Sequence, residues 1–172
     1  PTDPLAVARV LLAELTDALM PAGSPRDVAR IAAERIAEYF GLSRCLLVTI
    51  EGTAETATVL YEHGLGPESA VSSAYRISEI HDDDEVRRLA AGEPVAVNDV
   101  RRTPRTEDVV ERCTSLGISA ILTAPYISDG RWTFSLSAIR ATPHRWRADE
   151  ILLLRELAAR VYLRLDRARG DE

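Results

Sequence analysis

The sequence predicts an α+β fold, in which a central antiparallel sheet is flanked by long helices from both ends of the chain. Both ends carry apolar residues at alternating steps of three and four, which is the period of an amphipathic helix. The interior carries short runs in which apolar and polar residues alternate, as they do in a strand. Two of these runs flank Asp129-Gly130, a sequence that favours a hairpin because both residues adopt positive φ readily.

Two helices are expected at the N-terminal end. The first covers residues 4–20 and ends at the Pro-Ala-Gly sequence of residues 21–23. Ser24 can cap a second helix with Pro25 at its first position, and Gly41 ends that helix. The apolar stripe of the first helix consists of Leu5, Ala8, Leu12, Leu15 and Leu19.

The first hairpin is predicted from two strand-like runs that follow these helices. Residues 44–50 and 56–62 flank a short turn at residues 51–55. Shorter strands are expected near residues 75–77 and 94–99. We expect these segments to form one antiparallel sheet together with the second hairpin, which is described next.

The second hairpin joins residues 118–127 to residues 131–140, after a helix expected at residues 106–116. Alternation in its second strand separates large apolar side chains from small hydroxyl side chains. We expect the large side chains to pack on the terminal helices and the small ones to leave space for a ligand. The apolar set is Trp132, Phe134, Leu136 and Ala138, and the hydroxyl set is Thr133, Ser135 and Ser137.

The chain ends in a long helix predicted for residues 147–169. Its apolar stripe has two compatible explanations, because it can cover the sheet or form the seam of a helical dimer. We expect a homodimer formed by the first and last helices. Its predicted interface residues are Leu12, Leu15, Leu154, Val161 and Leu165.

The stretch HDDDEV, residues 81–86, concentrates one histidine and four carboxylates. Consecutive helical residues point in different directions, and the run lacks the alternating carboxylates and central Gly of a calcium loop, so we predict no metal site. Asp82 and Glu85 instead have the spacing of a capping box, followed by apolar residues at helical spacing from Val86 to the helix stop at Gly92. His81 remains a candidate ligand contact.

Composition narrows the class of protein. The chain has 172 residues, of which 46% are hydrophobic and 28% charged, as expected for one domain with a sizeable core. The net charge of −6 argues against a nucleic-acid partner, although Arg101, Arg102 and Arg105 form a local basic patch. The sequence shows no signal peptide and no apolar run long enough to span a membrane, so we expect a cytoplasmic location without membrane association. Cys45 and Cys113 are too few and too far apart for a zinc motif.

The sequence resembles the GAF domains of bacterial signalling proteins, in particular those of sensor kinases, over residues 25–169. The matching stretches are RIAEYFGLSRCLLVTIE, AAGEPVAVNDVRRTPR and the segment from LGISAILTAPYISDGRWTFSLSAIR to the end of the last helix. The resemblance implies a GAF-like, PAS-related fold with an antiparallel sheet, terminal helices on one face, and loops and short helices over a pocket on the other. It also implies a division into an N-terminal dimerisation or signalling helix (1–24) and a GAF domain (25–172).

Family subclasses are distinguished by short motifs, and this chain departs from three of them. It contains no Lys and therefore lacks the Asn-Lys-x-Phe-Asp/Glu type motif of the cyclic-nucleotide binders. Cys113 is followed by Thr114 and lies too close to Gly117 to match the covalent tetrapyrrole binders, so no covalent tetrapyrrole is expected. Residues 65–105 contain no cysteine, whereas the free methionine sulfoxide reductases use several there.

The resulting hypothesis is a sensory domain, not an enzyme, that binds a small molecule of unknown identity. Coupling to an output domain such as a histidine kinase would pass through dimeric terminal helices. The alternatives are a GAF domain with a degenerate pocket acting as a dimerisation module and, less favoured, a reductase. The candidate ligand-binding residues are Tyr75, Arg76, His81, Asn98, Asp99, Thr133, Ser135 and Ser137.

Overall fold

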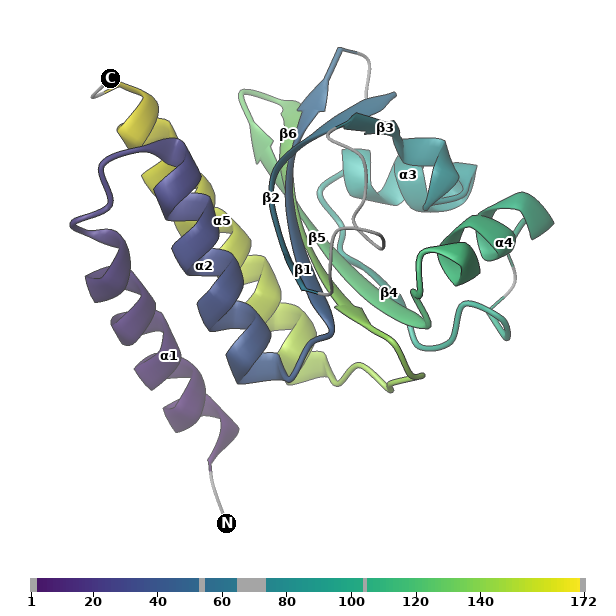
Figure 1. The fold of residues 1–172 in the computed structure, drawn as a ribbon, viewed down its shortest axis with the longest axis horizontal. Coiled ribbons are helices and arrows are strands. Elements are labelled where there is room, and N and C mark those ends of the chain that lie inside the picture. Colours follow the sequence, from purple (N-terminus) through teal and green to yellow (C-terminus); the bar gives the residue numbers. More distant parts are fainter. Residues whose placement is uncertain (1–2, 53–54, 65–73, 104, 171–172) are drawn as a thin grey trace.

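The computed structural model describes residues 3–52, 55–64, 74–103 and 105–170, and they form one layered α+β unit (Figure 1). The helices are α1 (Pro4–Leu19), α2 (Pro25–Phe40), η2 (Ile77–Glu79, a 3₁₀ turn), α3 (Asp83–Ala90), α4 (Glu107–Ser115) and α5 (Ala148–Gly170). The strands are β1 (Arg44–Glu51), β2 (Thr56–Gly64), β3 (Ala74–Arg76), β4 (Val95–Val97), β5 (Ala120–Ser128) and β6 (Arg131–Arg140). The elements expected from the sequence are all present, and their ends differ from the predicted ones by at most two residues.

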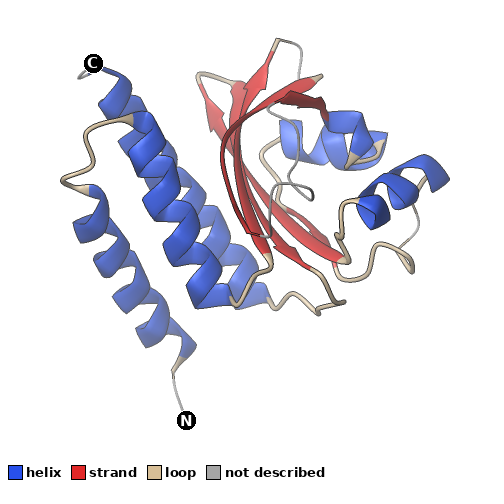
Figure 2. Ribbon diagram, viewed as in Figure 1, coloured by secondary structure: helices blue, strands red, loops and turns tan. Residues whose placement is uncertain are grey.

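The described strands form one sheet in the order β3-β2-β1-β6-β5-β4, with antiparallel pairing throughout. Helices α2 and α5 cover one face, and α1 packs outside them as a further layer (Figures 1 and 2). The short helices α3 and α4 lie on the opposite side of the sheet. The predicted antiparallel fold with terminal helices on one face is therefore confirmed.

Local sequence signals account for the ends of several elements. The Ser24 hydroxyl accepts a hydrogen bond from the Asp27 N–H at 3.1 Å, and Gly41 ends α2 with a left-handed φ of 66°. At the β5–β6 turn both Asp129 and Gly130 have positive φ, at 54° and 74°, as the hairpin prediction requires. The predicted β1–β2 turn includes residues 53–54, which lie outside the described residues.

The main core lies between the sheet and the terminal helices. Phe134, Leu136 and Ala138 of β6 are fully buried in it, together with Leu47 of β1. The inward-facing side chains from the helix layer include Leu15, Leu19, Ile36, Leu154, Leu157, Val161 and Leu165. The terminal helices thus contribute most of the apolar surface that covers this face.

The apolar stripes predicted to form a dimer seam are used within the single chain. Leu154, Val161 and Leu165 have exposed fractions of 0%, Leu15 has 1%, and Leu12 is half-buried against the same core. Leu15, Leu154, Val161 and Leu165 are therefore not available for the predicted dimer interface, because they pack on the sheet and on the other terminal helices of the same chain. The assignment of the half-buried Leu12 to an interface stays a prediction. Homodimer formation itself stays a prediction and needs a different surface.

Arg164 joins the first and last helices of the same chain. Its guanidinium donates to the backbone carbonyls of Leu19, Met20 and Ala22, at 3.2, 3.2 and 2.7 Å. These carbonyls lie at and just beyond the end of α1, where the last turn of a helix leaves acceptors without intrahelical donors. The C-terminal half of α5 therefore holds the end of α1 in place.

Replacing Leu165 with Glu should unfold the protein, because the substitution places an unpaired carboxylate in the main core. We expect a loss of about 4 kcal/mol or more in the free energy of unfolding, measured by urea denaturation. Leu152→Glu is the matched control, since Leu152 is 66% exposed on the same helix. Equal stability of the two variants would contradict the packing described here.

Candidate functional site

The face of the sheet opposite the terminal helices carries a second core with buried polar groups. Its apolar part includes Leu46 and Val48 of β1, Leu89 of α3, and Val109 and Cys113 of α4. The hydroxyls of Thr123, Ser135 and Ser137 are also buried at this face, with exposed fractions of 2%, 2% and 4%. This is the side on which the sequence analysis expected a ligand.

A β-bulge decides which side Trp132 occupies. Phe134 pairs with Tyr126 and Trp132 pairs with Ile127, so Thr133 is an extra residue without a partner in β5. The extra residue reverses the alternation, so Phe134 packs on the terminal helices while Trp132 joins the second core. Trp132 was predicted to face the terminal helices, and that prediction was wrong. Its indole N–H donates instead to the Ser135 hydroxyl at 2.9 Å.

The predicted capping box at the start of α3 is confirmed, and it also places His81 and Glu85 inside the fold. Asp82 Oδ1 accepts from the Glu85 N–H, and Glu85 Oε1 accepts from the Asp82 N–H, both at 3.0 Å. His81 and Glu85 are four residues apart and each is 4% exposed. Their side chains meet, with His81 Nδ1 lying 3.4 Å from Glu85 Oε1.

His81 connects this carboxylate to the hydroxyls of the sheet. Its Nε2 lies 3.2 Å from Thr123 Oγ1, which lies 3.0 Å from Ser137 Oγ. Because a carboxylate accepts and cannot donate, Nδ1 carries a proton and donates to Glu85. Nε2 accepts from Thr123 when the ring is neutral and donates to it when the ring is protonated. A continuous hydrogen-bonded line therefore runs from β6 through β5 to α3.

Arg105 supplies the opposite charge at the far end of this line. Its side chain is 0% exposed, and Nη2 donates to Glu85 Oε1 at 2.9 Å and to the Ile80 carbonyl. Nη1 lies 3.6 Å from the Cys113 sulfur. We call His81, Glu85, Arg105, Thr123 and Ser137 the buried polar line.

These neighbours set the acidity of Glu85. Burial alone would raise its pKa, but the hydrogen bond and charge of His81 and the charge of Arg105 outweigh burial and hold the pKa at about 2. Burial raises the pKa of the Cys113 thiol despite the opposing charge of Arg105, and burial raises that of Cys45 to about 12. The carboxylate is therefore ionised and both thiols are protonated at neutral pH.

The predicted site residues divide into two groups. His81, Ser135 and Ser137 come together at this face, and the half-buried Tyr75 packs against the second core, where burial followed by the charges of Glu62 and Glu79 raises its pKa. Arg76 is exposed at the sheet edge. The others have structural contacts: Asp99 Oδ1 accepts from the Arg101 N–H at 3.0 Å, and Thr133 Oγ1 donates to the Tyr126 carbonyl at 3.4 Å.

Asn98 ties the sheet edge to the start of α5. Its side-chain oxygen accepts from the Trp146 N–H at 3.0 Å, and its carbonyl accepts from the His144 N–H at 2.9 Å. The Trp146 indole donates to the Val97 carbonyl at 3.1 Å, and His144 lies 3.1 Å from Glu150 of α5. Asn98 therefore anchors a helix, a role that sequence reasoning did not assign to it.

Sequence reasoning missed four members of this site: Glu85, Arg105, Cys113 and Thr123. Glu85 was treated only as a cap, although its spacing of four from His81 places both on one helix face. Arg105 was grouped with Arg101 and Arg102 as a basic patch, but those two are exposed whereas the side chain of Arg105 is buried. Thr123 offered one signal, since it is a polar residue within an apolar strand.

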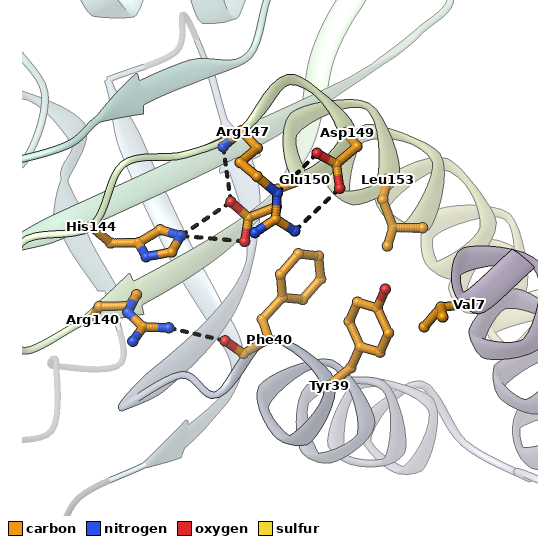
Figure 3. Close-up of a pocket in the computed structure, with 9 residues that line it drawn as sticks. All are labelled: Val7, Tyr39, Phe40, Arg140, His144, Arg147, Asp149, Glu150 and Leu153. Carbon is orange, nitrogen blue, oxygen red and sulfur yellow. Dashed lines mark hydrogen bonds and ion pairs between the residues drawn. The ribbon is translucent and has the colours of Figure 1, made fainter. Parts of the chain in front are cut away.

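A separate hollow of about 380 Å³ lies on the helix side, where α1 and α2 meet the start of α5 (Figure 3). Each of its basic side chains already has a partner: Arg147 lies 3.0 Å from Asp149, His144 is paired with Glu150, and Arg140 donates to the Phe40 carbonyl at 3.1 Å. Among the described residues the Arg140 Nε has no hydrogen-bond partner. None of the predicted site residues lines it. The buried polar line is therefore the stronger candidate.

Metal-ligand clusters and membrane-spanning helices are both absent from the residues that the structure describes. No group of three or more His, Cys, Asp or Glu side chains among them is arranged to hold a metal ion. No described helix has both the length and the apolar character needed to cross a membrane.

The sequence profile of the GAF domain matches residues 24–165, so the chain belongs to the GAF domain family. Solved structures with the same fold include a far-red absorbing protein with bound biliverdin IXα, at 15% identity and a TM-score of 0.78, covering 92% of this chain and 99% of that one. Another is the free methionine-R-sulfoxide reductase of Neisseria meningitidis in complex with its substrate. It is 18% identical with a TM-score of 0.77, and the match covers 100% of this chain and 96% of that one. A domain assigned to a two-component sensor histidine kinase of Sinorhizobium meliloti 1021 is also similar. It is 19% identical with a TM-score of 0.66, and the match covers 84% of this chain and 93% of that one.

These similarities lie below 25% identity, so they show the fold and not a shared ligand. No curated protein matches the chain. The family and the fold predicted from the sequence are both confirmed.

Because of Glu85, the free energy of unfolding should decrease as the pH falls. Its pKa is lowered from 4.5 to about 2 on folding, so its contribution is complete above pH 4.5 and is lost as the pH falls towards 2. Over this range wild type should lose about 3 kcal/mol more than Glu85→Gln in free energy of unfolding. Urea denaturation at a series of pH values measures the difference. Parallel curves for the two proteins would show that the carboxylate is not held in this way.

Proposed function

We propose that this GAF domain binds a small molecule at the face beneath α3 and α4 and transmits its occupancy to an output domain through the terminal helices. The observation that carries the proposal is the buried polar line. Burying charged groups costs free energy, and apolar side chains of similar size would fill the same space without that cost. Retaining an ionised carboxylate, an arginine and a histidine beside three hydroxyls is thus typical of a recognition site.

The structural neighbours add support from their own ligands. One contains bound biliverdin and another is in complex with its substrate, so this fold accommodates small molecules in those proteins. The sensor kinase neighbour supports a histidine kinase as the class of output domain for this chain. A kinase output draws on cytoplasmic ATP, which is why we retain the proposal of a cytoplasmic location.

The contacts around Asn98 offer a route between the two sides of the sheet. Strand β4 belongs to the face that carries the second core, and its end is bonded to the segment that leads into α5. A shift of β4 when a ligand binds would therefore move Trp146 and the first turn of α5. Signal transmission through this connection is part of the proposal.

We propose a binding domain in preference to an enzyme of the reductase type. Cys45 packs on the terminal-helix side of the sheet and Cys113 on the opposite side, so the sheet separates the two thiols. Thiol-based reduction that ends in an intramolecular disulfide needs two cysteines within bonding reach. Covalent attachment of a tetrapyrrole is likewise not expected, because the buried and protonated Cys113 thiol is a poor nucleophile.

Native mass spectrometry of the purified domain tests ligand binding. We expect wild type to carry a small molecule, taken up during expression or from a metabolite extract. Thr123→Val should lower the bound fraction about fivefold or more, since it removes the hydroxyl that links His81 to Ser137.

Thr49→Val is the matched control for this experiment. Thr49 lies two residues after Leu47 on β1, so its side chain points to the same face of the sheet, which is the one covered by the terminal helices. We expect this variant to retain the ligand. A wild-type protein that takes up nothing, or equal loss in both variants, would contradict the proposed site.

A second candidate function is that of an interaction module, and a groove between α1 and α5 favours it. The groove has a volume of about 670 Å³ and includes Met20 and Leu163, which are 70% and 58% exposed. Arg160 and Arg167 lie beside these apolar side chains. In this proposal the terminal helices form a homodimer through the groove, and not through the buried stripe.

Sedimentation at high micromolar concentration tests the dimer. We expect wild type to sediment as a dimer and Leu163→Glu as a folded monomer, because a charged side chain replaces the apolar contact that Leu163 makes at the interface. Leu152→Glu, at the start of the same helix and outside the groove, should remain dimeric. A monomeric wild type would remove this candidate function.

A further inference from the structure

The carboxylate of Glu85 satisfies several donors through a single oxygen. Oε1 accepts from the Asp82 N–H at 3.0 Å and from Arg105 Nη2 at 2.9 Å, and it lies 3.4 Å from His81 Nδ1. Three donors from two different segments therefore share one acceptor atom. A carboxylate has two oxygens with about four acceptor positions, so this arrangement uses its capacity unevenly.

Arg105 is similarly underused. It reaches Glu85 through one nitrogen only, whereas a guanidinium and a carboxylate pair most strongly through two parallel hydrogen bonds. Its Nη1 contacts the Cys113 sulfur, which is a weak acceptor, and its buried Nε has no hydrogen-bond partner among the residues that the structure describes. An arginine with a fully buried side chain thus retains hydrogen-bonding capacity that the described part of the chain does not fill.

The need for an anion at this position is nevertheless strict. The Arg105 side chain is 0% exposed, and an uncompensated charge buried to this degree is very unfavourable. Among the described residues, Glu85 is the carboxylate in contact with it. Any molecule that enters beside Arg105 must leave Glu85 in place or bring a negative charge of its own.

We propose that Arg105 and His81 anchor a carboxylate group of the ligand, and that Glu85 is an internal counterion that this carboxylate replaces. The inference rests on the proposed ligand-binding function and specifies the chemical class of the ligand. A ligand carboxylate across Nε and an Nη atom of Arg105 would form the two-point pair that Glu85 does not make. The charge of the cluster is unchanged by the exchange once Glu85 turns outward.

The exchange has a structural consequence because Glu85 is also half of the α3 capping box. When its carboxylate leaves, the Asp82 N–H loses its acceptor and the first turn of α3 is less stable. Ligand binding at Arg105 is thereby linked to the order of α3, which packs on the same core as β4. The N-terminus of α3 is the element expected to respond first.

Propionate is a suitable probe, since it reproduces the end of the Glu85 side chain, and propionamide is its neutral counterpart. We expect the unfolding temperature of wild type to rise with propionate and not with propionamide at equal concentration. In Glu85→Gln the half-saturating propionate concentration should fall about tenfold or more, because the competing negative charge is gone.

The double variant Glu85→Gln/Arg105→Gln is the matched control. Removing both charges together avoids leaving one of them buried alone, so this variant should fold at least as well as Glu85→Gln, which leaves the Arg105 charge without its counterion. We expect no response to propionate from it. An equal response of the double variant and Glu85→Gln, or no gain in Glu85→Gln over wild type, would overturn the proposal.

Hydrogen exchange provides the second readout. Amides in the first turn of α3 should exchange faster in wild type when propionate is added, and unchanged exchange there would refute replacement of Glu85. Finding by native mass spectrometry a ligand that lacks a carboxylate, and whose binding is lost in Thr123→Val, would overturn this inference while leaving the proposed function intact.

Discussion

The fold depends on a sheet that has to be covered on both faces. Strands β1, β5 and β6 are buried along most of their length, so neither face can be left to water. The terminal helices cover one face with large aliphatic side chains, which leaves the shorter helices and the connecting segments for the other. This unequal division separates a stabilising core from a face on which polar groups are assembled.

The bulge at Thr133 shows how one residue can alter that division. Without it, Trp132 would continue the apolar side of β6 and pack against the terminal helices. With it, the indole enters the second core and bonds to Ser135. The start of β6 thus contributes an aromatic side chain to the candidate site, while Phe134, Leu136 and Ala138 of the same strand stay in the main core.

Glu85 serves two structural purposes that are usually separate. It caps α3 from within the helix, and it balances the charge of Arg105 from the following segment of the chain. Because the same oxygen serves both purposes, the position of α3 and the state of the buried charges depend on one another. The hydrogen bonds of Asn98 and Trp146 then connect strand β4 to the start of α5.

The sequence by itself determined the elements and much of their order, because caps, hairpin turns and hydrophobic period are local properties. Asp82 with Glu85, Ser24, and Asp129-Gly130 act over a few residues, and the structure shows each as predicted. Only the tertiary structure decided which residues meet. Arg105 and Thr123 are distant in sequence from Glu85 and His81, and their contacts arise because antiparallel pairing and helix packing bring four segments to one place. The same reason explains why the apolar stripe of α5 does not form a dimer interface. Leu154, Val161 and Leu165 have the period of a dimer seam, but in the folded chain they are buried against the sheet and α2.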